Sequence, residues 1–103
     1  MWIVLNNAFF SIVQNANNGE ELLVRARVKG DIEKIFPKAD VFEDNYADYK
    51  YRSFIDRENV ASTIKEKALN INYGNFKSSV SKSDYERSSA YADVWSALYK
   101  LQK

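Results

Sequence analysis

Five basic side chains in the first half of the chain have a spacing with which they could contact a phosphate backbone together. They recur at every second position of two separate segments: Arg25, Arg27 and Lys29, then Lys50 and Arg52. Residues two apart on a β-strand point to the same face of a sheet. If the two strands are neighbours, these residues predict a cationic sheet face that binds phosphates, with Phe54 or Phe10 available to stack on a base.

A plainer interpretation of the same five residues is the ordinary solvated side of a sheet. Long basic side chains commonly cover apolar surface with their stems while the charged group stays in water. Fifteen basic and fourteen acidic groups give a formal net charge of only +1, so any electrostatic recognition must be local. Both interpretations remain open.

The polar and aromatic segment at residues 72–79 is a second candidate recognition surface. Its contact residues would be Tyr73, Phe76 and Lys77, and Gly74 would permit an unusual backbone angle. One glycine without a Gly-Lys-Ser/Thr ending does not make a phosphate loop. Alternatively, the segment is a connector whose two aromatic side chains anchor it to the core.

Acidic residues gather in a third segment, with two tyrosines between them: Asp40, Glu43, Asp44 and Asp48, with Tyr46 and Tyr49. Their oxygens could hold a hard cation, or two of the carboxylates could do general acid–base work. The ligand spacing and the glycine of an EF-hand are absent. We interpret the segment as a solvated hairpin loop and predict no metal site and no catalytic residue.

The chain contains no histidine and no cysteine, which excludes more functions than any motif adds. Imidazole is the usual general base near neutral pH, and thiolate is the most reactive nucleophile. Their absence excludes Ser-His-Asp and Cys-His triads, zinc sites with these ligands, and disulfides. We therefore expect no cofactor and no enzymatic activity, with a carboxylate- or metal-dependent enzyme as the least favoured alternative.

The 103 residues, 46% of them hydrophobic, predict one domain spanning residues 1–103. The apolar start of the chain lacks the basic region and cleavage site of a signal peptide, and no stretch approaches the roughly 18 apolar residues of a spanning helix. We expect a cytoplasmic protein that does not associate with membranes.

Residues 1–56 favour strands, because aromatic and β-branched residues alternate with turn residues. The expected strands are 2–5, 9–14, 21–29, 41–44 and 49–55. A short helix should begin at Asp31, with that side chain as its cap, and stop before Pro37. We expect most of the large aromatic residues in the core, namely Trp2, Phe9, Phe10, Tyr51, Tyr91 and Trp95.

The second half favours helices. Asp56 is the expected N-cap of a helix over residues 58–71, and Ser83 with Glu86 matches the capping box of a last helix. That helix carries an apolar stripe of Tyr91, Val94, Trp95, Leu98 and Leu101. Strands first and helices last predict an α+β fold. It would be a mainly antiparallel sheet of about five strands, with two longer C-terminal helices and one short helix packed on one face.

Several short motifs also resemble, in their order along the chain, a family of small uncharacterised proteins of bacteria and their phages. They are Phe9-Phe10-Ser11, residues 23–27, residues 48–52, residues 72–77, and the ending from Tyr91 to Gln102. The resemblance covers nearly the whole chain and implies a fold without an assigned activity. Longer members often carry a histidine near the last helix, and this chain lacks it.

The residue inventory thus favours a small binding domain that recognises a macromolecular partner, either nucleic acid or protein. A phage or mobile-element accessory protein that inhibits a host protein is the alternative, with exposed aromatic side chains as anchors. A homodimer through an open edge strand is a further possibility.

Overall fold

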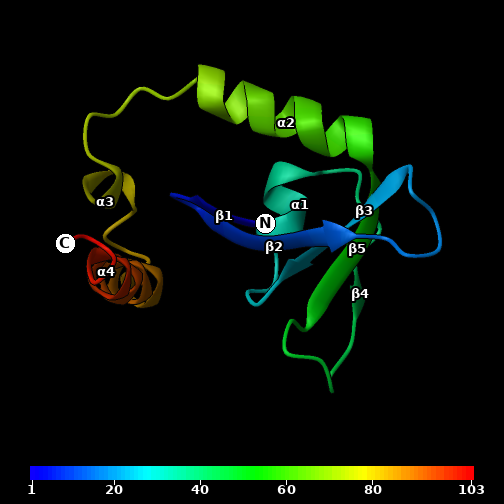
Figure 1. The fold of residues 1–103 in the computed structure, drawn as a ribbon, viewed down its shortest axis with the longest axis horizontal. Coiled ribbons are helices and arrows are strands. Elements are labelled where there is room, and N and C mark those ends of the chain that lie inside the picture. The colour runs from blue at the N-terminus through cyan, green and yellow to red at the C-terminus, as the bar shows by residue number, and fades with distance from the viewer. The chain divides into compact units, whose positions relative to one another are not determined.

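The computed structural model describes residues 1–103 and divides them into two compact units, Met1–Ile71 and Asn72–Lys103. The first unit contains all the strands with helices α1 and α2, and the second contains α3 and α4 (Figure 1). That residues 1–103 act as one domain stays a prediction.

Five strands form one antiparallel sheet in the order β1-β2-β3-β5-β4. Their bounds are β1 Trp2–Leu5, β2 Ala8–Gln14, β3 Glu21–Ala26, β4 Phe42–Glu43 and β5 Tyr51–Asp56. The α+β class and the five-stranded antiparallel sheet predicted from the sequence are therefore confirmed. The neighbouring positions of β3 and β5 also meet the condition under which the two basic segments share a face.

The predicted bounds of the last three strands are wrong. β3 ends at Ala26 instead of Lys29, because the chain turns from Arg27 onward toward α1, and Gly30 completes this turn with a φ of 91°. β4 is only Phe42–Glu43, and the loop after it extends through Tyr49 and Lys50. Arg27, Lys29 and Lys50 consequently lie outside the strands.

The hydrophobic core lies on one face of the sheet. Alternate residues of the strands point into it, including Phe10, Val24 and Ile55. Helix α1 (Asp31–Ile35) contributes Ile32, and helix α2 (Arg57–Leu69) contributes Val60. The rings of Phe10 and Phe36, just after α1, lie 5.8 Å apart. Both helices thus pack on the core face, as the alternation of apolar residues predicts.

Asp31 does not cap α1. The N-cap position is Gly30, and Asp31 is the first helical residue, with its side chain fully buried. Its carboxylate accepts a hydrogen bond from the backbone N–H of Phe9 at 3.0 Å and pairs with Lys34 Nζ at 3.2 Å. Asp31 is the predicted N-cap but is in fact the first residue of the helix. Its side chain therefore links α1 to β2 and does not cap the helix.

The last helix, α4 (Tyr85–Tyr99), also begins with a different cap from the predicted one. Asp84 is the N-cap, and its side chain accepts from the backbone N–H of Arg87 at 3.2 Å. The hydroxyl of Ser83 pairs with that of Ser81 instead. A capping side chain must precede the first helical residue directly, and Asp84 holds that position.

Two of the aromatic residues predicted to be in the core are exposed instead. Trp2 is 67% exposed and Trp95 52%, whereas Phe10 is buried. Leu98, another member of the apolar stripe of α4, is also exposed. The prediction that this helix carries Leu101 is wrong, because α4 ends at Tyr99 and Leu101 lies in the turn after it, where it is 76% exposed. No helix of the structure is both long and apolar enough to cross a membrane.

Candidate nucleic-acid interface

The face of the sheet opposite the core, the open face, carries side chains from every strand. On β3 and β5 the core takes Leu22, Val24 and Ile55, so the alternate residues point to the open face. By this alternation its main members are Trp2, Phe9, Ser11, Glu21, Leu23, Arg25, Phe42, Arg52, Phe54 and Asp56.

One row of the open face crosses all five strands. Trp2 is paired with Ser11, Ser11 with Arg25, Arg25 with Arg52, and Arg52 with Phe42. We call these five residues the transverse row. It places two arginines at the centre of the sheet and an aromatic ring on each edge strand.

Arg25 is held from both sides. Its Nη2 donates to Ser11 Oγ at 2.6 Å, and its Nε donates to the Ser11 carbonyl at 3.4 Å. The guanidinium carbon also lies 4.8 Å from the centre of the Tyr49 ring, a cation–π distance. Arg25 is therefore oriented before any ligand arrives.

Arg52 and Arg27 are oriented by the same loop. Arg52 Nε donates to the Tyr49 carbonyl at 3.0 Å, and its Nη2 lies 3.9 Å from Asp48 Oδ1. Arg27 Nε donates to the Asp48 carbonyl at 3.3 Å, and its guanidinium carbon lies 4.4 Å from the Tyr49 ring centre. We call Arg25, Arg27 and Arg52 the arginine cluster.

Tyr49 organises this cluster, and sequence reasoning missed it. The side chain is only 4% exposed although it lies in a loop, and its ring is 6.4 Å from that of Phe9. The sequence grouped Tyr49 with acidic loop residues. An aromatic residue directly before a basic, strand-forming segment is the only signal that could have indicated its role.

The arginine cluster is a local concentration of positive charge in a chain whose formal net charge is only +1. Arg25 and Arg52 are direct cross-strand partners, an arrangement that is unfavourable for like charges. Asp48 is the one carboxylate that forms an ion pair with the cluster. Several guanidinium N–H groups of the three arginines have no hydrogen-bond acceptor. Those N–H groups are suited to a planar or tetrahedral anion such as phosphate.

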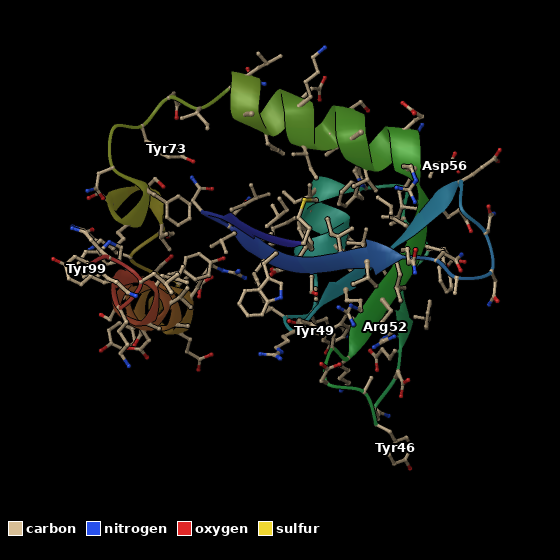
Figure 2. All side chains as sticks on the ribbon, in the orientation of Figure 1. Tyr46, Tyr49, Arg52, Asp56, Tyr73 and Tyr99 are labelled. Carbon is tan, nitrogen blue, oxygen red and sulfur yellow. The ribbon has the colours of Figure 1, made fainter.

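The opposite end of the open face is acidic. Along the same two strands, Arg25 pairs with Arg52, Leu23 pairs with Phe54, and Glu21 pairs with Asp56. Figure 2 shows Arg52 and Asp56 separated along β5. The face is therefore graded from basic to acidic, and an anion should bind only at the basic end.

The two predicted lysines of the cationic face do not join the arginine cluster. Lys29 is exposed in the turn after β3. Lys50 precedes β5, and its Nζ lies 5.7 Å from the centre of the Tyr51 ring. Of the five predicted residues, the structure brings together Arg25, Arg27 and Arg52.

The segment at residues 72–79 is a short helix in part, α3 (Phe76–Ser79), not a loop throughout. The Asn75 side chain caps it by accepting from the Ser78 N–H at 3.0 Å. Phe76 packs between Tyr73 and Tyr91 of α4, with ring centres 6.0 Å and 5.9 Å away. Lys77 Nζ lies 4.1 Å from the Trp95 ring centre. These contacts within the second unit fit an anchored connector.

The acidic residues of the hairpin include Asp44 and Asp48, which make local contacts. No group of three or more carboxylates is placed to hold a metal ion. Asp44 instead accepts from the Tyr46 N–H at 3.0 Å, a local turn bond, and Tyr46 is fully exposed at the loop tip (Figure 2).

Comparisons of the chain with protein-family models, with curated proteins and with solved structures find no match. The resemblance to small bacterial and phage proteins therefore stays an expectation.

Proposed function

We propose that the protein is a non-enzymatic binding module of the cytoplasm whose open face binds nucleic acid through the arginine cluster. One observation carries the proposal: Arg25 and Arg52 are held side by side on the open face by Ser11 and the Tyr49 loop. Placing like charges opposite each other opposes folding. A bound phosphate would offset that repulsion.

The chemistry of the cluster supports phosphate over other anions. Guanidinium groups make two parallel hydrogen bonds to phosphate oxygens, which a lysine ammonium does not. Exposed aromatic residues flank the arginines on the open face, with Phe42 44% exposed and Phe54 46%. Arginines with stacking rings are the combination that binds nucleic acids without strict sequence preference.

The test is fluorescence anisotropy of labelled oligonucleotides titrated with the full chain at several salt concentrations. If three phosphates are contacted, the logarithm of the association constant should fall with the logarithm of salt at a slope of about −2. Arg25→Glu and Arg52→Glu should abolish binding, and Arg27→Glu should weaken it. Lys65→Glu is the matched control, because it makes the same charge change on α2, in the layer that covers the core face.

Two outcomes would contradict the proposal. Binding that survives both Arg25→Glu and Arg52→Glu, with the fold intact by circular dichroism, would show that the open face is not the contact surface. If Lys65→Glu weakened oligonucleotide binding equally, the effect of the arginine variants would be due to net charge and not to their position.

A protein partner is the second candidate, supported by the exposed apolar side chains of α4. Leu98 is 57% exposed and Trp95 52%, and aromatic residues often anchor protein interfaces. The partner in this second candidate function is either a host protein, which an accessory protein of a phage or mobile element would block, or a second copy of the chain in a homodimer. Sedimentation of the pure chain tests the homodimer, and a pull-down that returned no stoichiometric partner would count against the inhibitor.

A further inference from the structure

We infer that the nucleic acid is single-stranded and crosses the strands along the transverse row, with bases stacked at both ends and phosphates at the centre. This inference rests on the proposed function, because it needs the arginine cluster to bind phosphate. It adds the form of the ligand and its direction on the sheet.

Exposed rings lie at both ends of the row. At one end, Trp2 on β1 is 67% exposed, and Phe9 meets it edge to face at 6.1 Å. At the other end, Phe42 on β4 stacks with Phe54 on β5 at 5.7 Å. Phe42 and Phe54 cover one face of each other, and the exposed remainder of each ring pair offers a surface on which any base can stack.

The length of the row suits a short single strand. Strands of a sheet are about 4.8 Å apart, so four spacings separate Trp2 from Phe42 by about 19 Å. A sheet of four strands in a common RNA-binding module stacks two or three bases on its surface. The transverse row has comparable width. Ser11 itself is only 3% exposed and is hydrogen-bonded by Arg25, so the ligand would contact the two arginines and the two ring sites and not Ser11.

The charge gradient sets the direction. A ligand running along β3 and β5 would pass from the Arg25–Arg52 pair to the Glu21–Asp56 pair. Phosphates would then meet carboxylates, which repel them. A ligand running across the strands keeps its phosphates on the arginines and never reaches the acidic pair.

The ring sites also require unpaired bases. In a duplex the bases stack on one another, and their faces cannot reach side chains on a sheet. A single strand can turn its bases toward Phe42 and Trp2 while its backbone contacts the arginines. The open face should therefore discriminate against a duplex that offers it phosphates alone.

The experiment uses the full chain carrying Trp95→Phe, which leaves Trp2 as the sole tryptophan. A single-stranded oligonucleotide and a hairpin duplex of equal charge are titrated separately. We expect saturable quenching of Trp2 by the single strand, with at least tenfold weaker binding of the duplex. Phe42→Leu and, separately, Phe54→Leu should weaken single-strand binding about tenfold and leave duplex binding unchanged.

Tyr46→Leu is the matched control, because it also removes an exposed ring but lies at the loop tip away from the row. It should change neither titration. The melting temperature of each variant shows whether the fold is intact. Because Phe42 and Phe54 stack on each other, the two phenylalanine variants both test the same ring site.

The outcomes separate the two proposals. Equal affinity for single strand and duplex, with both phenylalanine variants unchanged and Arg25→Glu inactive, would overturn this inference and leave the proposed function standing. Binding of neither form at low salt would overturn both and leave the second candidate, a protein partner of α4, as the remaining function. A loss with Tyr46→Leu equal to that with Phe42→Leu would move the ring site to the loop.

Discussion

The sheet unit, Met1–Ile71, and the helical unit, Asn72–Lys103, distribute their apolar side chains in opposite ways. In the sheet unit, strands, α1 and α2 enclose a shared core that includes Phe10, Ile32 and Val60. In the helical unit, Val80 is the only buried apolar residue. The apolar stripe of α4, including Trp95 and Leu98, remains exposed.

This difference shows that a clear apolar stripe does not by itself make a core. A stripe is buried only where another element supplies a complementary surface, as α1 and the strands do for each other. The sheet unit should therefore carry most of the stability, while the exposed stripe of α4 should contribute little. Three changes test this comparison.

The largest effect is expected from Phe10→Ala in the core of the sheet unit. Removing a ring that is 1% exposed leaves a cavity and should lower the free energy of unfolding by about 3–5 kcal/mol. The matched change Leu98→Ala removes an exposed side chain and should cost no more than about 0.5 kcal/mol. Urea unfolding of both variants measures this, and similar losses would show that the α4 stripe is buried in solution.

A smaller loss is expected from Asp31→Ala, which removes the link between α1 and β2. The variant removes a fully buried carboxylate and leaves the partly buried N–H of Phe9 without this acceptor, at a cost of about 2 kcal/mol. Glu33→Ala, at an exposed position of the same helix, is the control and should be nearly neutral. Thermal unfolding compares them, and an equal effect of both would mean that the Asp31 contact contributes nothing specific.

The smallest effect is expected in the helical unit, from Asp84→Ala at the start of α4. Loss of the cap should cost about 1 kcal/mol and speed hydrogen exchange at the Arg87 amide. Ser83→Ala should leave that amide protected. The reverse result, with Ser83→Ala as the damaging change, would restore the capping box predicted from the sequence.

Local patterns predicted most of the elements. Runs of aromatic and β-branched residues between turn residues located the strands, and apolar residues three and four apart located α2 and α4. Boundaries were less predictable, because the turn at Gly30 and the caps depend on single backbone positions. The shift from Ser83 to Asp84 is an example, since both side chains can cap and only the first helical residue decides between them.

The candidate site was predicted in part. The sequence singled out Arg25, Arg27 and Arg52 by their spacing, and the structure places all three around Tyr49. It did not reveal the ring ends of the transverse row, because Trp2 matches a core residue by type. For Tyr49 it offered only the position of an aromatic residue directly before a basic strand, because the burial of that ring depends on contacts with residues far away along the chain, such as Phe9 and Arg25.

The sequence by itself determined the α+β class, the five strands, the main helices and the function classes that an absence of histidine and cysteine excludes. These properties depend on residue type and on short-range periodicity. Only the tertiary structure decided that β3 and β5 are neighbours, that Arg25 pairs with Arg52, and that an aromatic ring lies at each end of their row. Strand order and register join residues far apart along the chain, and no local pattern encodes which distant partners will meet.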